Sequence, residues 1–370
     1  MTNEATTPSV SGYKFDLAIF IGRVQIFHKE HERAVRRALE IGQIALVIVG
    51  SAGKARDIRN PFTFEERAQM IRDTFDNNPR LIVVPQRDHP YNDTMWQSYV
   101  QGEVKARIKG IPAPRIALVG HRKEDTNYYI DMFPKWEFVE MGQQVNICAS
   151  DLREVLFRDD LSIANKLDKV QVHASPRVID IIRKFAYTAD VNGRCTPTDE
   201  MQRLMREASF LRKHKASWAE APYAPTFVTV DSVIIQSGHV LLIKRRSAPG
   251  EGLWAIPGGY LDQGERINDA WLRELREETK LKVAAGVLRN SVVDREVFDY
   301  PGRSLRGRIV THAFCIKLNN GPLPAVKAAS DAKRAVWVPI DEFYQMQDQM
   351  FEDHFHIIDY FISRLPKETP

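Results

Sequence analysis

Three glutamates in the second half of the chain have the residue type and spacing of metal ligands. Glu274, Glu277 and Glu278 lie in a run from about 269 to 279 that lacks Pro and Gly, and this composition favours a helix. The spacing of i, i+3 and i+4 places the three carboxylates on one helix face. Like charges this close repel unless a cation lies between them. Because Mg²⁺ and Mn²⁺ prefer oxygen ligands, the pattern predicts a divalent-metal site.

The same helix face has a second interpretation. Arg273 and Arg276 alternate with the acids, which is also typical of a solvated, salt-bridged surface. The residues before the helix favour the metal site. Trp254-Ala-Ile-Pro-Gly-Gly259 comes first, and Glu265 follows Gly259 after five intervening residues.

From Gly259 to Leu281 the stretch resembles the signature of the Nudix hydrolases, which cleave a nucleoside diphosphate linked to another moiety. The resemblance implies metal binding by the three glutamates, with either Glu277 or Glu278 also a candidate general base. Two roles are open for Glu265, which either braces the loop through Arg273 or contacts the metal from its edge.

One residue departs from this signature. Lys280 stands where the family usually has Gly, directly after the helix. A lysine there favours the helix C-terminus by its charge, but a left-handed cap conformation is costly for it.

Two histidines near the N-terminus have the residue type and spacing of an anion-binding site. His28 and His31 lie three residues apart where a helix begins, beside the unpaired backbone N–H groups of a helix start. This arrangement suits an anion such as a phosphate, although two surface histidines also fall near each other by chance.

The sequence around these histidines resembles nicotinamide mononucleotide (NMN) adenylyltransferases. Gly22-Arg-Val-Gln-Ile-Phe-His-Lys-Glu-His31 is similar to that family's Gly-Arg-Phe-Gln-Pro-Phe-His-x-Gly-His motif. Further stretches resemble the family's later motifs: 49–52, 60–67, 91–96, 119–125 and 147–153.

The resemblance implies adenylyl transfer, in which the phosphate of NMN attacks the α-phosphorus of ATP and gives NAD and pyrophosphate. His28 and His31 then hold ATP phosphates, Arg153 clamps the departing pyrophosphate, and Ser150 supports the same oxygens. Trp96 is expected to stack on the nicotinamide ring, although an aromatic residue here is also compatible with the core. The remaining nucleotide-binding candidates of this half are Gly22, Arg23, Gln25, Gly120 and Arg122.

Four residues of this half depart from the family pattern: Val24, Ile26, Glu30 and Cys148. Glu30 replaces a glycine between the two histidines. A carboxylate directed at the triphosphate would oppose ATP binding, whereas one directed outward from the first helical turn would be harmless. The sequence leaves both orientations open.

The elements around these motifs predict an α/β chain with two domains. Apolar runs at 13–21, 43–50, 80–85 and 115–120 alternate with helical patterns at 31–41, 63–76 and 93–109. Unbroken apolar strands separated by helices favour a doubly wound, Rossmann-like nucleotidyltransferase domain, with its ligand at the carboxyl ends of the strands.

Helical patterns at 162–170, 176–186 and 197–216 follow, and Ala221-Pro-Tyr-Ala-Pro225 then predicts a stiff linker. Strands are expected at 226–236, 239–246, 287–294, 309–317 and 334–339, with Ser237-Gly238 as a hairpin turn and helices at 269–279 and 351–364. This order fits the Nudix α/β/α sandwich. The predicted divisions are a tail at 1–12, a nucleotidyltransferase domain at 13–175, a helical connector at 176–222 and a Nudix domain at 223–370.

Two basic stretches of the second domain suit a diphosphate and a ribose, although an exposed basic loop explains them equally well. Together with Gly259, the candidates are Arg245, Arg246, Arg303 and Arg306. The order of the two domains resembles the bifunctional bacterial NMN adenylyltransferase/Nudix hydrolases. That resemblance implies hydrolysis of ADP-ribose to AMP and ribose 5-phosphate.

Composition sets the remaining expectations. The chain has 370 residues, 27% of them charged, and a net charge of +4, which is too small to indicate nucleic-acid binding. We find no apolar run of membrane-spanning length and no signal peptide, and the three cysteines are scattered. We therefore expect a cytoplasmic enzyme acting on ADP-ribose, NMN and ATP with Mg²⁺ or Mn²⁺, without nucleic-acid or membrane partners; a homo-oligomer remains open.

Two other hypotheses compete with a two-activity enzyme. In the first, the N-terminal domain only binds nucleotide and regulates the hydrolase, as the altered loop at Glu30 suggests. In the second, the chain is a ligand sensor that controls transcription. This last hypothesis requires a DNA-recognition helix and a degraded acidic face, whereas the only helix candidate, 201–218, lacks a clear helix-turn-helix partner and all three glutamates are present.

Overall fold

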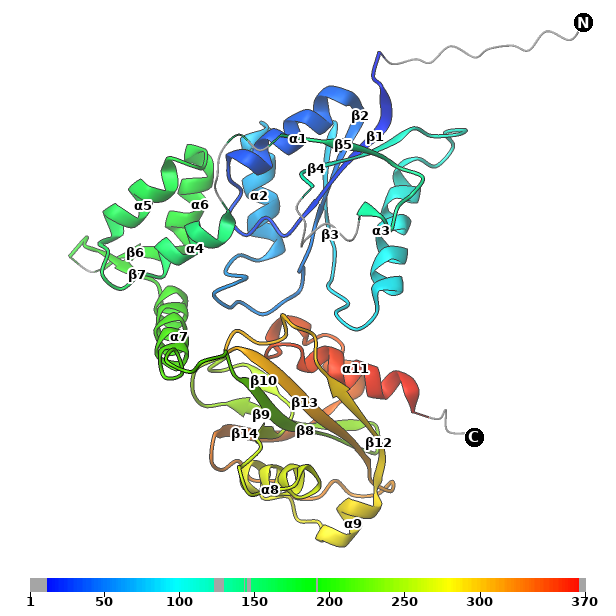
Figure 1. Ribbon diagram of the computed structural model, residues 1–370, viewed down its shortest axis with the longest axis vertical. Coiled ribbons are helices and arrows are strands. Elements are labelled where there is room, and N and C mark those ends of the chain that lie inside the picture. The colour runs from blue at the N-terminus through cyan, green and yellow to red at the C-terminus, as the bar shows by residue number, and fades with distance from the viewer. Residues whose placement is uncertain (1–11, 123–129, 143, 145–147, 191, 366–370) are drawn as a thin grey trace, which may run out of the picture. The chain divides into compact units, whose positions relative to one another are not determined.

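The computed structural model describes residues 12–122, 130–142, 144, 148–190 and 192–365. The chain divides into two compact units (Figure 1). The first contains the residues up to Ala52 together with Arg59–Thr198, and the second contains Gly53–Ile58 together with the residues from Asp199 onward. Each unit combines a sheet with flanking helices, which confirms the predicted α/β class. The domain boundaries proposed from the sequence remain a prediction.

The first unit is built on a parallel sheet of five strands in the order β3-β2-β1-β4-β5. The strands are β1 (Phe15–Gly22), β2 (Gly42–Val49), β3 (Leu81–Pro85), β4 (Ile116–Gly120) and β5 (Glu137–Glu140). The first four confirm the apolar runs in the sequence. The sequence pattern did not indicate β5, because its residues Glu-Phe-Val-Glu are only partly buried at the sheet edge.

Helices cover both faces of this sheet, as a doubly wound fold requires (Figure 1). The helices α1 (Lys29–Ile41) and α2 (Phe64–Thr74) cover one face, and α3 (Asp93–Arg107) covers the other. Val100 and Val104 of α3 are fully or almost fully buried in a cluster with Leu17 and Leu118. The strand order reverses between β1 and β4, so the loops after these strands meet at the point where such folds bind ligands.

A helical group follows β5, consisting of α4 (Ala149–Leu156), α5 (Ile163–Gln171) and α6 (Pro176–Ala186). Serine caps start two of these helices: the hydroxyls of Ser162 and Ser175 accept the backbone N–H groups of Asn165 and Val178. A small hairpin of β6 (Tyr187–Ala189) and β7 (Cys195–Pro197) comes next. The sequence pattern of this region indicated helices and did not indicate these two strands, which have three residues each and pair with each other.

The second unit begins with α7 (Asp199–Ala216) and contains a mixed sheet of seven strands. Five follow the order β10-β9-β8-β13-β12, while β11 pairs with β8 and β14 pairs with β9. The strands are β8 (Thr226–Gln236), β9 (His239–Arg245), β10 (Trp254–Ala255), β11 (Gly258–Tyr260), β12 (Val292–Phe298), β13 (Arg308–Lys317) and β14 (Ala332–Pro339). The turn Ser237-Gly238 joins β8 to β9 with φ of 47° and 73°, which confirms the predicted hairpin.

Helices α8 (Ile267–Thr279) and α11 (His354–Arg364) lie on opposite sides of this sheet, giving the predicted α/β/α sandwich (Figure 1). Trp271 and Leu275 of α8 are buried in a cluster with Val230 and Phe314 of the sheet. Two shorter helices are α9 (Ala285–Asn290) and α10 (Ile340–Phe343), and a 3₁₀ turn spans Gln347–Gln349. The strand predicted at 287–294 was therefore misplaced: its first half is α9, and β12 starts only at Val292.

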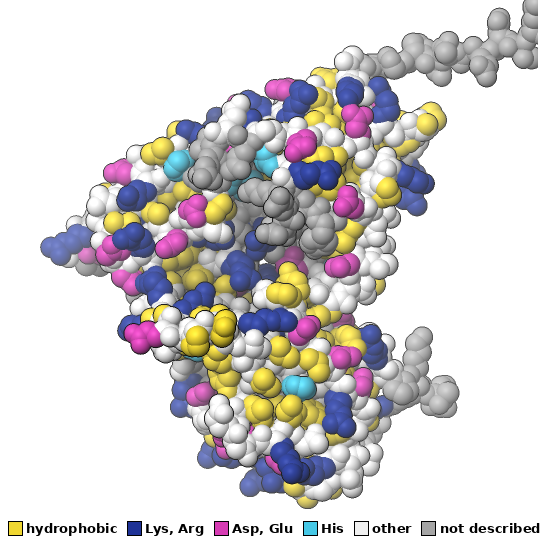
Figure 2. Space-filling view, viewed as in Figure 1, with side chains coloured by type: hydrophobic (Ala, Val, Ile, Leu, Met, Phe, Trp, Pro, Cys, Tyr) yellow, Lys and Arg dark blue, Asp and Glu magenta, His cyan; other side chains and the backbone are white. Residues whose placement is uncertain are grey.

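Two surface properties bear on the classes of partner. No helix in the described ranges is long and apolar enough to cross a membrane. On the face seen in Figure 2, Lys and Arg side chains are interspersed with Asp and Glu. That face therefore carries no large field of a single sign.

Candidate active sites

The loop after β1 joins the sheet of the first unit to α1. It leaves β1 at Gly22, and His28 caps α1 with extended backbone angles. Within the loop, Val24 and Ile26 have φ of 51° and 84°, in the left-handed region that β-branched residues avoid. Both side chains are buried. Such strain persists only where surrounding contacts fix the backbone, and it is concentrated at functional loops.

Two buried polar side chains fix this loop. The amide of Gln25 donates to the carbonyl of Phe62 at 3.1 Å and accepts its N–H at 3.0 Å. Arg67 is 1% exposed and donates to the carbonyls of Arg23, of Gly50 at 2.7 Å and of Thr63 at 3.1 Å. Burial lowers the pKa of Arg67 to about 10. The side-chain amide of Gln25, a nucleotide-binding candidate in the sequence, thus stabilises the loop.

The two predicted histidines lie side by side at the start of α1. Their ring centroids are 3.7 Å apart at an interplanar angle of 22°, and His28 is 4% exposed. This is the first turn of a 13-residue helix, where backbone N–H groups and the helix dipole favour an anion. The structure therefore combines two imidazoles with a helix N-terminus.

Arg153 reaches the same loop from α4. Its guanidinium donates to the carbonyl of Gln25 at 3.0 Å and to the hydroxyl of Ser150 at 3.1 Å. The residue is 8% exposed. These contacts join the predicted pair Arg153 and Ser150 to the loop that ends at His28. Their predicted role, holding phosphate oxygens, remains a proposal.

Glu30 adopts neither of the two orientations considered from the sequence. It is 5% exposed and forms an ion pair with Arg33 at 2.8 Å. Its carboxylate also lies 3.4 Å from Nε2 of His121, whose Nδ1 is 2.6 Å from the carbonyl oxygen of Met141. The negative charge is therefore compensated by Arg33 inside the unit.

The other candidates of the first unit come from α3 and from the end of β4. Trp96 belongs to α3 and packs on the core cluster, with its ring 6.2 Å from that of Phe133. Gly120 ends β4, and the Arg122 guanidinium lies 5.4 Å from the ring centroid of Phe138. Part of two sequence motifs, residues 123–125 and 147, lies outside the described residues.

In the second unit, α8 presents the three glutamates as the sequence predicted. Glu278 is 4% exposed and accepts the backbone N–H of Gly258 at 2.9 Å. Burial raises the pKa of Glu278 to about 8, and the neighbouring charge of Glu274 adds to this effect. Burial likewise raises the pKa of Glu274. Glu277 is half-exposed.

Close packing explains the two glycines before the helix. A Cβ on Gly259 would lie 2.6 Å from a carboxylate oxygen of Glu274, and a Cβ on Gly258 would lie 2.3 Å from the carbonyl oxygen of Val230. Only glycine lets β11 pass this close to its neighbours. One of these neighbours is the acidic face of α8, which carries Glu274, Glu277 and Glu278.

Arg273 connects the acidic residues. It donates to Glu265 at 2.9 and 2.8 Å, to Glu274 at 2.8 Å and to Glu277 at 3.3 Å. It also donates to the carbonyl of Tyr260 at 3.2 Å. Of the two roles considered for Glu265, the structure shows the brace through Arg273.

Comparison with known proteins identifies a family for each half of the chain. The NUDIX domain family matches residues 225–361, and the cytidylyltransferase-like family matches residues 19–95. A solved structure of a bifunctional NMN adenylyltransferase/ADP ribose pyrophosphatase from Francisella tularensis has 31% identity and a TM-score of 0.84, covering 95% of this chain and 99% of that chain. A second structure with that name and source, complexed with AMP and a Mn ion, has 31% identity and a TM-score of 0.83 over 94% and 99% of the two chains.

Single-activity proteins match each half. A nicotinamide/nicotinic acid mononucleotide adenylyltransferase of Acinetobacter baylyi is 36% identical over 39% of this chain and 77% of its own length. An ADP-ribose pyrophosphatase of Methanocaldococcus jannaschii is 34% identical over 37% of this chain and 73% of its own length. The chain belongs to the bifunctional NMN adenylyltransferase/ADP-ribose pyrophosphatase family.

Within this family member, the arginines expected to contact substrate have buried acidic partners. Arg303 forms two 2.9 Å hydrogen bonds with Asp353, and both side chains are almost fully buried. Arg306 pairs with Glu352 at 3.1 Å and lies between the rings of Tyr260 and Phe351. Sequence reasoning missed both acids, which were taken as the start of a helix at 351.

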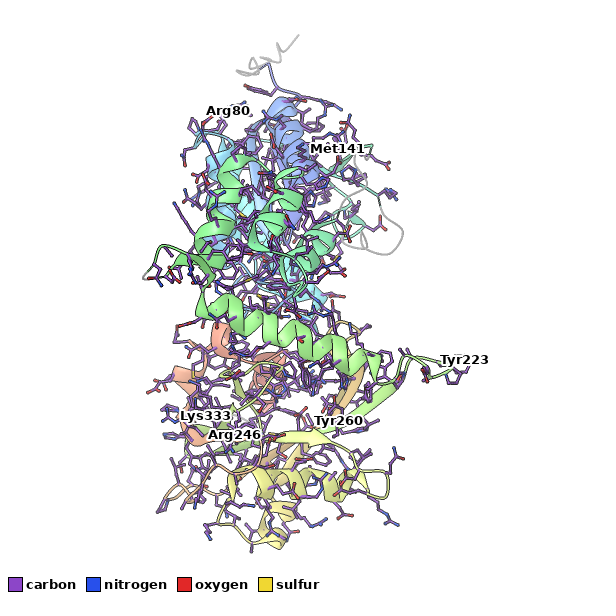
Figure 3. The ribbon with its side chains drawn as sticks, turned by 90° about the vertical axis from the view of Figure 1, so that its left-hand side faces the viewer. Arg80, Met141, Tyr223, Arg246, Tyr260 and Lys333 are labelled. Atoms are coloured by element: carbon purple, nitrogen blue, oxygen red, sulfur yellow. The ribbon has the colours of Figure 1, made fainter. Side chains whose placement is uncertain are left out.

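Arg245 and Arg246 lie at the end of β9. Arg245 donates to the carbonyl of Pro249 at 2.8 Å and stacks 4.2 Å from the ring centroid of Phe351. Arg246 donates to the carbonyl of Ala332 at 3.0 Å, beside Lys333 of β14 (Figure 3). The structure thus brings Arg245 and Arg306 to the same aromatic ring and places Arg246 at the adjoining strand.

Two further buried groups complete the region. Asp231 of β8 accepts the hydroxyl of Thr311 at 2.6 Å, and burial raises the pKa of Asp231 to about 6. No residue spacing in the sequence indicated these two, because they come from strands 80 positions apart.

The carboxylates of α8 offer oxygen donors of the kind that a divalent metal ion prefers. In the described ranges, no group of three or more His, Cys, Asp or Glu is already arranged to hold one. Arg273 instead compensates the charges of Glu274 and Glu277. The donor chemistry nevertheless fits, since Glu274 and Glu278 are carboxylates whose ionisation is opposed by burial and by neighbouring carboxylates.

Proposed function

We propose that this chain is a two-activity enzyme of NAD metabolism. The second unit hydrolyses ADP-ribose to AMP and ribose 5-phosphate, and the first unit transfers an adenylyl group from ATP to NMN. The observation that carries the hydrolase is the carboxylate pair of buried Glu278 and partly buried Glu274, held against the glycines Gly258 and Gly259. Membership of the bifunctional family supports both halves.

In the proposed hydrolase, Glu274, Glu277 and Glu278 would hold Mg²⁺ or Mn²⁺, and a bound ion would polarise the diphosphate and lower the pKa of a water molecule there. In the hydrolysis, the oxygen of a water molecule forms a bond to one phosphorus, the bridging phosphorus–oxygen bond breaks, and a carboxylate takes the proton of the water. We propose Glu277 for this proton, since its half-exposed side chain reaches solvent while Glu278 is fixed by the Gly258 N–H.

In the proposed transferase, an oxygen of the NMN phosphate attacks the α-phosphorus of ATP, and the bond to the β-phosphate breaks with release of pyrophosphate. His28 and His31 hold ATP phosphates at the start of α1. Arg153 and Ser150 hold the leaving pyrophosphate from α4. The reaction needs positioning and charge compensation, which this set of residues supplies without a covalent intermediate.

One observation supports the alternative that the first unit binds nucleotide without catalysis. Glu30 contacts His121, which stands in a stretch that resembles a motif of the adenylyltransferases. A carboxylate at that imidazole changes the charge offered to a phosphate. The compensation of Glu30 by Arg33 argues in the other direction, so we retain the two-activity proposal.

The decisive experiment uses the Glu277→Gln protein, in which hydrolysis does not obscure the product. We would measure NAD formation from NMN and ATP with Mg²⁺. NAD formation supports the two-activity enzyme. Nucleotide binding without NAD formation, together with intact ADP-ribose cleavage by the wild-type protein, would establish the alternative.

The proposed setting of these reactions follows from the same chemistry. The partners are the small molecules ADP-ribose, NMN and ATP. We propose the cytoplasm as the compartment, because all three cysteines are free in the structure.

A further inference from the structure

The helix α7 is bound to a segment from earlier in the chain. Residues Gly53–Ile58 follow Ala52 of the first unit but belong to the second. Arg203 of α7 donates to the carbonyl of Arg56 at 2.9 Å and pairs with Glu200 at 2.7 Å. The second unit therefore includes a piece of chain from before its main sequence, attached through α7.

Glu207 lies one turn farther along α7 and links it to a loop of the sheet. It is 3% exposed, lies 3.4 Å from Arg203 and accepts the backbone N–H of Gly250 at 3.3 Å. Burial, together with the charge of Asp57, raises the pKa of Glu207 to about 7. Burying a carboxyl group costs free energy unless it has hydrogen-bond partners. This cost keeps the Gly250 amide and Arg203 in contact with Glu207.

The loop that receives Glu207 carries a candidate substrate residue. It joins β9 to β10 and is closed by Arg245, whose guanidinium donates to Pro249 and whose carbonyl accepts the N–H of Gly252. The ring of Phe351 lies 4.2 Å below Arg245, and a Cβ on Gly250 would lie 2.2 Å from that ring. The position of Gly250 therefore determines where Phe351 and Arg245 lie.

We propose that Glu207 is a positioning residue of the hydrolase, which fixes Arg245 through the amide of Gly250. The helix α7 and the segment Gly53–Ile58 then contribute to the structure of the hydrolase site. Arg245 is the group that meets the substrate diphosphate, so this inference rests on the proposed hydrolase function. A loosened loop weakens binding of the anionic substrate more than it slows the chemical step.

The test compares Glu207→Met with Glu207→Gln. Both side chains fill the space, but only glutamine retains an acceptor for the Gly250 N–H. We expect Glu207→Met to raise KM for ADP-ribose about tenfold with kcat changed by less than about twofold, because one buried hydrogen bond is lost. Glu207→Gln should keep KM within about twofold of wild type. An unchanged KM in Glu207→Met, or an equal rise in both variants, would overturn the proposal.

Arg206→Ala is the matched control. Arg206 is the preceding residue on α7, and it pairs at 3.5 Å with Glu251, directly after Gly250, across an exposed surface. Its loss should leave KM unchanged because exposed pairs contribute little. A rise equal to that of Glu207→Met would show that any contact between α7 and the loop has this effect, which contradicts a specific role for Glu207.

A second measurement needs no variant. Amide hydrogen exchange in the wild-type protein should show slow exchange for the Gly250 N–H, and fast exchange there would overturn the proposal whether or not the variants fold. These experiments also distinguish a failure of this inference from a failure of the proposed hydrolase function. Wild-type protein without ADP-ribose hydrolysis would refute the proposed function, whereas active wild type with a normal Glu207→Met would refute only the role of Glu207.

Discussion

At the scale of single residues, His354 shows how burial sets the charge of a group. It is the first residue of α11, is 6% exposed, and its Nδ1 accepts the backbone N–H of Ile256 at 3.1 Å. Burial lowers the pKa of His354 to about 3, although Asp353 opposes the shift. The imidazole is therefore neutral in the folded protein over the whole physiological range.

We predict that His354 makes the unfolding free energy of the protein fall at acid pH. The unfolded chain gains a proton on His354 below about pH 6.5 while the folded chain does not, so stability falls as pH falls from about 6.5 towards 3, by up to about 1.4 kcal/mol per pH unit. His354→Gln keeps an acceptor for Ile256 and should lose less stability between pH 7 and pH 5 than wild type. Urea midpoints at both pH values measure the difference, and equal losses would contradict the prediction.

The acidic face provides a second prediction at this scale. Glu277→Gln should reduce ADP-ribose turnover by at least about 100-fold, since a general base and a metal ligand are lost together. The fold should be retained, because Glu277 is half-exposed and outside the core. Turnover near the wild-type value, with an unchanged circular dichroism spectrum, would remove the residue from the mechanism.

The sequence predicted residue types at the sites better than their partners. Spacing along one helix placed Glu274, Glu277 and Glu278 together, because helix geometry alone determines that face. The pairing of Arg303 with Asp353 joins positions 50 residues apart, and no periodicity encodes such a contact. The compensation of Glu30 by Arg33 was not predicted, because the helix predicted at 31–41 begins after Glu30, whereas α1 starts at Lys29 and places the two residues three apart on one helix.

At the scale of elements, α8 ends in a conformation that its residue disfavours. Lys280 has φ of 47° and ψ of 33°, the left-handed cap conformation that is costly for a lysine. Lys280→Gly should raise the unfolding free energy of the second unit by about 0.5–1 kcal/mol, because glycine adopts this conformation without steric cost. Lys280→Ala is the control and should give no gain. Chemical unfolding followed by Trp fluorescence measures both, and a gain in the alanine variant would attribute the effect to charge.

Elements were predicted well where one chain segment determines its own structure. The buried strands β1 and β2 have long apolar runs, β8 is rich in β-branched residues, and α8 has strong helix formers. The short strands β10 and β11 have two and three residues, and their strand character comes from pairing with β9 and β8. Such elements depend on tertiary contacts, which a local pattern does not contain.

At the scale of the whole molecule, the two sites are built from separate sets of residues. Arg153→Ala should reduce adenylyl transfer at least about tenfold, because its contacts to Gln25 and Ser150 lie in the first unit. ADP-ribose hydrolysis should be unchanged. Assays of both activities on one preparation test this, and parallel losses would contradict independent sites.

The composition of the units could not be predicted from the sequence. The helical run at 197–216 was predicted but was placed in a connector, because an amphipathic pattern does not say which surface the helix covers. In the structure its buried residues Leu204 and Leu211 belong to a helix of the second unit. The segment Gly53–Ile58 carries no signal of its own for joining that unit.

This discontinuity affects any attempt to divide the enzyme. A single break between α6 and α7 would leave Gly53–Ile58 on the N-terminal fragment, although that segment is part of the second unit. The C-terminal fragment would then lack the backbone carbonyl that receives Arg203. A gene split at this point would encode two fragments, neither of which contains the complete second unit.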